Sequence, residues 1–186
     1  MASSHSHNDI TNKHQRITLT SHKINVQTKE IAILIQESYL INTQTIALCP
    51  AKAMDHDTIV IEHNRTYKVN KTPLQLIKDA CIANWSTYEG KRQAVIHHTN
   101  FRQKVPIPIN IEQNIFTFPT HAPTDFECYW LFFNHISHIK GTKNPNQTRI
   151  TFNNNQHIIL PISQYIFKKQ YERTFTCMMG VKGIYG

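Results

Sequence analysis

Histidine is the side chain of this 186-residue protein with the widest chemical range, because a neutral imidazole binds metals and exchanges protons near neutral pH. His135 and His138 lie three residues apart, a spacing that brings two ligands to one side only in a helix. A strand is predicted there, in which the two would face opposite ways. The adjacent residues His97 and His98 are also predicted in a strand, so they too would face opposite ways and would not form a pair of metal ligands. We expect these histidines to be solvated or hydrogen-bonded.

The dipeptide His56-Asp57 suggests an alternative function, a metal-dependent hydrolase. Metal phosphohydrolase chemistry needs further His and Asp ligands carried on helices, whereas the residues around His56 predict loop and strand. Metal analysis of the purified protein separates this hypothesis from the others, since a metal-free protein contradicts it. The sequence predicts no metal site and no cofactor.

Nucleophilic catalysis has no stronger candidate. The four cysteines include no close pair of the kind that zinc ribbons use, and we expect buried free thiols. Cys81 and Cys128 fall on apolar faces, where a thiol is normally inert. The chain has no Gly-x-Ser-x-Gly elbow and no glycine-rich phosphate loop. Its carboxylates are few and scattered, so the protein is predicted not to be an enzyme.

Lysine and arginine remain as the candidate functional side chains. They number 20 against 12 Asp and Glu, which gives a formal net charge of +8 and a pI near 9.4. This balance favours an anionic partner, with nucleic acid ahead of a membrane surface. An AT-rich genome also enriches Lys together with Asn, Ile and Thr, so the charge alone does not decide between these explanations.

The placement of the basic residues is more informative than their number. Lys91 and Arg92 follow a glycine that is predicted to lie in a turn, so both should project from a loop. Lysine and arginine on loops suit phosphate contacts, which weaken steeply with salt. Two further lysines are expected on the outer face of the last helix. The candidate DNA-binding residues are Lys91, Arg92, Arg102, Lys104, Lys140, Lys143, Arg149, Lys168 and Lys169.

These side chains must be positioned mostly by β-strands, because β-branched residues and alternation dominate the chain. A hairpin is expected over residues 39–48 and an Asn turn at 153–155. The prolines of segment 105–109 confine it to a sheet edge or a connector. Further strands are predicted within residues 16–35 and at 58–61, 67–69, 94–97, 115–118, 129–133, 149–152 and 157–160, with a turn at Glu89-Gly90.

Two helices interrupt this pattern. Thr72, Pro73 and Gln75 form a capping box with proline at the first helical position. Ser163 is expected to cap the second helix. The stripes expected to face the core are Leu74, Ile77, Cys81 and Trp85 in the first helix, and Phe167, Tyr171, Phe175 and Met178 in the second.

The predicted fold class is therefore α+β: a single domain, predominantly antiparallel β-sheet, with one central helix and one C-terminal helix. Residues 1–15 are polar and unpatterned and are expected to form a disordered tail, with the domain over 16–186. No apolar run reaches the length of a membrane span, and the N-terminus lacks the pattern of a signal peptide. We expect a cytoplasmic, nucleoid-associated protein with no membrane partner.

The order of motifs in the middle of the chain resembles the ComK family, the competence transcription factors of low-GC Gram-positive bacteria. The similarity covers about residues 37 to 174 and rests on order and spacing, since no single piece is diagnostic. The matching pieces are Glu37-Ser38-Tyr39, Thr45-Ile46-Ala47, Pro50, Val69-Asn70, Pro73-Leu74-Gln75, Cys81, Tyr88, Gly90-Lys91-Arg92, Ala94, Ile115-Phe116, Phe118-Pro119-Thr120, Trp130, Thr151-Phe152, Leu160-Pro161-Ile162-Ser163, Phe167, Gln170 and Arg173-Thr174.

This resemblance implies a transcriptional activator that binds paired AT-rich boxes upstream of DNA-uptake genes. It implies minor-groove contact with bending of double-stranded DNA, and a homo-oligomer with one dimer on each box. A minor-groove protein reads width and A·T content, so scattered Lys, Arg, Asn and Gln suffice without a recognition helix. Lys91 and Arg92 are the best candidates for groove contact because they match a motif and are predicted on a loop. RNA polymerase is left open as a partner.

Two departures from the family pattern bear on this expectation. The first ~36 residues have no counterpart, and the chain stops at Gly186, where family members continue through a helical tail. That tail carries the recognition segment for a Clp-protease adaptor, so an adaptor partner is left open. The alternative function is a degenerate paralogue that forms a heterodimer with a full-length relative.

Overall fold

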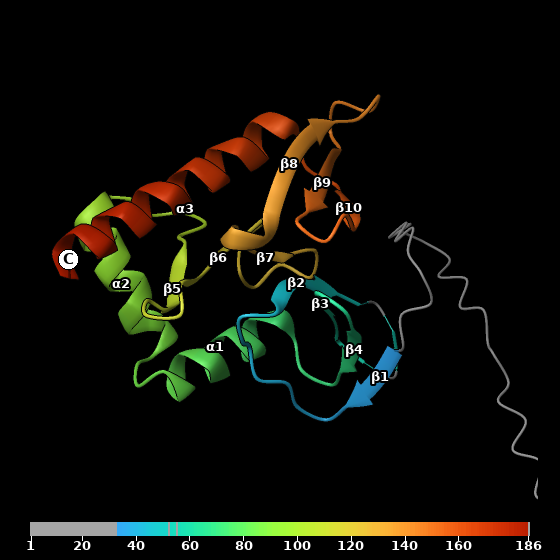
Figure 1. The fold of residues 1–186 in the computed structure, drawn as a ribbon, viewed down its shortest axis with the longest axis horizontal. Helices are drawn as coiled ribbons and strands as arrows, with labels where there is room; N and C mark the ends of the chain where they lie inside the picture. Colours follow the sequence, from blue (N-terminus) through green and yellow to red (C-terminus); the bar gives the residue numbers. More distant parts are fainter. Residues whose placement is uncertain (1–32, 52, 55, 186) are drawn as a thin grey trace, which may run out of the picture.

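The fold is described from a computed structural model, which covers residues 33–51, 53–54 and 56–185. The predicted tail at 1–15 and the strands predicted over 16–32 lie outside the described residues. Ile33–Gln36 forms a strand, in agreement with the predicted pattern at the end of that region. The turns and sheets of the rest of the chain can be followed in Figure 1.

A seven-stranded sheet forms the centre of the described part of the chain, in the order β1-β4-β3-β2-β7-β6-β5. Three further strands form a smaller antiparallel sheet in the order β10-β9-β8. The strands are β1 Ile33–Gln36, β2 Thr45–Pro50, β3 Thr58–Glu62, β4 Thr66–Val69, β5 Ile107–Asn110, β6 Ile115–Pro119, β7 Trp130–Phe132, β8 Ile136–Gly141, β9 Thr148–Phe152 and β10 His157–Leu160; the helices are α1 Pro73–Ala83, α2 Tyr88–Thr99 and α3 Gln164–Tyr185, with a 3₁₀ turn η1 at Phe133–His135.

The two faces of the large sheet carry two separate apolar cores. Leu48 and Val60 point to the face that α1 covers, where they pack with Trp130. Ala47 and Ile61, their neighbours along the same strands, point to the opposite face, which the small sheet and α3 cover. This alternation is the two-residue period of a strand buried on both sides. The large sheet is therefore the middle layer of the fold (Figure 1).

The predicted fold class is confirmed: an α+β domain built mainly on antiparallel strands. Every described pairing is antiparallel except that of β1 with β4. Strand β5 lies at the edge of the large sheet and contains Pro108, as expected for a residue that has no N–H to donate. The Asn turn between β9 and β10 is also confirmed, with Asn155 at φ 64°.

Helix α1 begins where the capping box predicted. The Thr72 side chain accepts a hydrogen bond from the backbone N–H of Gln75, whose side chain accepts one from the Thr72 N–H at 2.8 Å. The predicted core position Trp85 is wrong, since its side chain is 99% exposed. The helix ends at Ala83, and Trp85 adopts a left-handed backbone with φ 56°. The chain therefore leaves the helical path before it could return Trp85 to the buried face.

Helix α2 replaces the turn predicted at Glu89-Gly90 and the strand predicted at 94–97, so the described chain has two central helices instead of one. Only Tyr88 and Val95 of this helix are buried, which is too few to produce a helical apolar pattern. Thr87 caps the helix, because its side-chain oxygen accepts a hydrogen bond from the Gly90 N–H at 2.9 Å. Glycine at position 90 lets its backbone lie close to the Thr87 side chain, since a Cβ there would be only 3.0 Å from the Thr87 oxygen.

Replacing Thr87 by alanine should lower the free energy of unfolding by about 1 kcal/mol, because a first-turn N–H of α2 loses its acceptor. Urea denaturation followed by circular dichroism measures the change. Thr124, which is exposed in the loop between β6 and β7, supplies the control substitution Thr124→Ala. Equal effects of the two substitutions would contradict the capping role of Thr87.

Helix α3 begins as predicted at the Ser163 cap, whose side-chain oxygen accepts from the Ile166 N–H at 3.3 Å. The predicted apolar stripe is wrong beyond its first turns. Phe167 is buried, but Phe175 is half exposed, and Thr174 and Cys177 occupy the buried face in its place. A polar residue such as Thr174 can be buried on this face because its hydroxyl donates a hydrogen bond to the Gln170 carbonyl at 2.8 Å.

The hairpin predicted over 39–48 is only half correct. Strand β2 forms as expected, but residues 39–42 form no strand. The Tyr39 hydroxyl instead donates to the Glu62 carboxylate at 2.6 Å, while the Thr45 N–H donates to the Asn42 carbonyl. Burial of Tyr39 and this carboxylate raise the pKa of the phenol. The segment is thus fixed by a side-chain hydrogen bond and a backbone turn bond in place of a β-ladder.

Candidate nucleic-acid interface

The hairpin of β8 and β9 brings three of the candidate cations together. Lys140 and Arg149 are directly opposite in the strand register, and both side chains are exposed. Lys143 is exposed in the turn that joins the strands. All three line a groove of about 560 Å³, together with the amide side chains of Asn144 and Gln147. Three cations without an acidic residue in the lining form a site suited to an anion.

The turn of this hairpin is held by its own polar groups. The Gln147 N–H donates to the Asn144 carbonyl at 3.0 Å, and the Thr142 hydroxyl donates to the same carbonyl at 3.0 Å. The Asn144 side-chain oxygen accepts from the Asn146 N–H at 3.0 Å. These bonds fix a tight turn, and the turn projects beyond the body of the molecule (Figure 1).

The segment around this hairpin contains no carboxylate at all. Between Glu127 and Glu172 the sequence has five Lys and Arg residues and no Asp or Glu. This stretch supplies the whole small sheet and the first turns of α3. A local count of acidic residues along the chain would have revealed it, whereas the overall net charge hides it. The small sheet and the start of α3 therefore form an electropositive part of the fold.

Lys168 and Lys169 are exposed on α3, as predicted. The start of this helix packs on β8, because the Gln164 amide donates to the Ile139 carbonyl at 3.2 Å. Lys168 lies one helical turn after Gln164 and so on the same side of the helix. The start of α3, where both lysines are found in the sequence, consequently lies at the same end of the molecule as the hairpin (Figure 1).

The other four candidates form a separate group around α2 and the loop after it. Lys91 and Arg92 lie on the helix and are half-buried, so their predicted loop position is wrong. Burial lowers the pKa of Lys91. The Arg92 guanidinium donates to the backbone carbonyl of Arg102 at 3.2 Å, and thereby anchors the loop that contains Lys104. Side chains engaged in this way are less free to contact phosphate than those of the hairpin.

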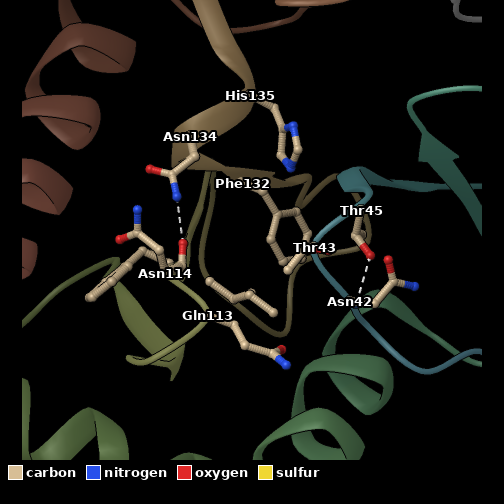
Figure 2. Close-up of a pocket in the computed structure, with 10 residues that line it drawn as sticks. Asn42, Thr43, Thr45, Gln113, Asn114, Phe132, Asn134 and His135 are labelled. Carbon is tan, nitrogen blue, oxygen red and sulfur yellow. Dashed lines mark hydrogen bonds between the residues drawn. The ribbon is translucent and has the colours of Figure 1, made fainter.

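A smaller polar hollow of about 230 Å³ lies where β2 and β6 begin and β7 ends (Figure 2). Asn42, Gln113 and Asn134 contribute amides to its lining. Two of these amides form hydrogen bonds with nearby backbone groups. The Asn134 side chain donates to the Asn114 carbonyl at 2.5 Å, and the Asn42 side chain accepts from the Gln44 N–H at 2.8 Å. No cation lines this hollow within the described part of the chain. Its polar groups mainly stabilise turns.

The family model of the ComK protein matches residues 36–182. The chain belongs to the ComK family. It is also 34% identical over 140 residues to the competence transcription factor of Bacillus subtilis (strain 168), which covers 74% of this chain and 72% of that relative. No solved structure gives a significant match. The family resemblance drawn from the motifs is therefore confirmed.

This ComK protein is a transcription regulator of the competence type, and proteins of this family are transcription factors rather than enzymes. DNA is the partner that such a regulator implies. Within the described residues, no helix is long and apolar enough to cross a membrane.

The histidines of this ComK protein do not gather into a metal site in the described part of the chain, where no three His, Cys, Asp or Glu side chains are placed to hold an ion. His135 lies in η1 and not in a strand as predicted, while His138 is exposed on β8. His97 and His98 lie on α2 with their ring planes 83° apart. Burial lowers the pKa of His135, and nearby His63 adds to the effect.

The prediction of buried free thiols is confirmed, since all four cysteines are reduced and buried. Burial raises the pKa of Cys49 and Cys177 to about 12, and that of Cys81 and Cys128 to about 11. Thiols with such pKa values are protonated near neutral pH and are poor nucleophiles.

Proposed function

We propose that this protein is a DNA-binding activator of DNA-uptake genes, which binds paired AT-rich boxes through phosphate and minor-groove contacts. One observation carries the proposal: the small sheet and the start of α3 hold five cations and no carboxylate, three of them around one exposed groove. Within the described part of the chain, none of these five is ion-paired with a carboxylate. Their charge is therefore available to an external anion.

Phosphate contact is the first role of this surface. Each cation that neutralises a phosphate releases condensed counterions from the DNA, which favours binding entropically and makes it salt-dependent. Lys140, Lys143 and Arg149 are the primary contacts in this proposal. Lys168 and Lys169 extend the surface along α3. Lys91, Arg92, Arg102 and Lys104 are placed second, because α2 and its loop already engage part of that group.

The second role of this surface is to select A·T base pairs, which we assign to amide side chains in the hairpin turn. The minor groove of an A·T pair presents only acceptors, adenine N3 and thymine O2, to which an amide NH₂ can donate. Asn144, Asn146 and Gln147 stand at the hairpin turn among the cations. A protein that presents amides and cations to the minor groove distinguishes A·T from G·C base pairs without a recognition helix. Two copies on each box, as a dimer, would match the pairing of the boxes, with RNA polymerase as the partner of the bound assembly.

Competition between DNA fragments tests this function. The full chain should bind a promoter fragment with two A/T boxes at least about 10³-fold more tightly than a base-shuffled fragment at physiological salt. Equal binding to both fragments would contradict sequence selection. Failure to bind either fragment, together with formation of a heterodimer with a full-length relative, would favour the degenerate-paralogue hypothesis.

A further inference from the structure

An exposed proline stands in the turn that joins β8 to β9, the hairpin that carries Lys140, Lys143 and Arg149. Pro145 is exposed, and it follows Asn144 in the turn closed by the hydrogen bond from the Gln147 N–H to the Asn144 carbonyl. Proline suits this second position of a tight turn because its ring fixes φ near the required value. The turn therefore holds a rigid apolar ring away from the body of the molecule.

The groups behind the proline suit a nucleic-acid groove. Lys140 and Arg149 lie opposite each other on the two strands, five residues before Pro145 and four residues after it. At about 3.3 Å per residue in an extended strand, this separation places their backbone at most roughly 13–17 Å behind Pro145. A tip that enters a groove would thus bring these cations to the phosphates at its rims. Nothing acidic in the lining of the hairpin groove opposes this approach.

Resting on the proposed function, we infer that Pro145 acts as a wedge that inserts between two base pairs from the minor groove and kinks the DNA at each box. Apolar side chains, proline among them, unstack a base step in this way and bend the duplex by about 20–90°. The thymine–adenine steps of AT-rich DNA are the easiest to unstack, so the kink itself adds selectivity for the box.

The hydrogen bonds within the turn reduce the entropy that the tip would lose on insertion. Unstacking a step costs a few kcal/mol, which the phosphate contacts of the hairpin must offset. A flexible tip would also lose conformational entropy on insertion, whereas the tip of this hairpin is ordered before it binds. The wedge and the cations therefore have separable effects: the wedge bends the DNA and the cations supply most of the affinity.

Pro145→Ala tests the wedge in the full chain, with Pro123→Ala in the loop between β6 and β7 as the matched control. The DNA is a two-box fragment with a fluorescent dye at each end, so energy transfer reports the bend. A second version of the fragment carries 2-aminopurine beside a thymine–adenine step, where unstacking raises its fluorescence. Circular dichroism and urea denaturation verify that both variants fold.

We expect Pro145→Ala to reduce the bend by at least about 20° and to abolish the 2-aminopurine signal, with less than about a 10-fold loss of affinity and an unchanged salt dependence. Pro123→Ala should behave like the original protein. An unchanged bend and signal in Pro145→Ala would overturn the wedge while the original protein still binds the boxes. Absence of selective binding by the original protein would instead overturn the proposed function itself.

Discussion

Replacing Lys140, Lys143 and Arg149 together by glutamine is expected to lower the affinity for DNA roughly 500-fold at about 0.1 M salt. The reason is the loss of three phosphate contacts, each of which contributes about 0.9 to the slope of log K against log salt concentration for duplex DNA. The slope should therefore fall by about 2.7, and the affinities of the two proteins should converge near 1 M salt. Titrations by fluorescence anisotropy at four salt concentrations measure both quantities.

The same change of charge on another surface provides the control. Lys71, Lys78 and Lys182 are replaced by glutamine; the first two form exposed ion pairs with Asp79 and Glu89, which contribute little to stability. The control should lose only the weak, long-range part of the attraction. If it lost as much affinity and as much slope as the hairpin variant, net charge would explain binding and the hairpin would have no special role.

Replacing Phe167 by alanine should reduce the free energy of unfolding by about 3–5 kcal/mol, the largest effect on stability that we expect from a single substitution on α3. Phe167 is fully buried, and its ring meets that of Phe118 edge to face with the centroids 5.5 Å apart. The substitution leaves a cavity between α3 and the large sheet. Because a domain of this size has only about 5–15 kcal/mol of stability in total, much of the margin would be lost.

Urea denaturation and thermal melting measure this change. Phe126→Ala is the matched control, since the Phe126 side chain is 87% exposed in the loop between β6 and β7. A surface substitution of this kind should alter the free energy of unfolding by less than about 0.5 kcal/mol. Similar losses for the two phenylalanines would mean that α3 does not form the core contact described above.

Most of the described strands and the starts of helices α1 and α3 could be predicted because their signals are local. The capping box at Thr72 and the serine at 163 each need only a few neighbouring residues to act. The prolines of segment 105–109 limited it to a sheet edge or a connector, and the structure places Pro108 in the edge strand β5. Helix α2 has a local cap at Thr87, but it was missed because the helix buries only two residues and its glycine suggested a turn.

The candidate site could be predicted only in part. Sequence patterns selected the basic residues, but preferred Lys91 and Arg92, which the helix α2 holds half-buried. The hairpin trio gains its importance from strand register, which places Lys140 against Arg149 across nine positions of sequence. Register depends on which strands pair, and pairing is decided by contacts distant in the sequence.

By itself, the sequence determined the fold class, the family and the absence of an acidic counterpart along residues 128–171, since each of these is a property of residue order and type. Only the tertiary structure decided which of the scattered cations share a surface. The physical reason is that a charge acts over distances in space and not along the chain. The hairpin joins Lys140, Lys143 and Arg149 at one groove, whereas Lys91 and Arg92 are held half-buried on α2.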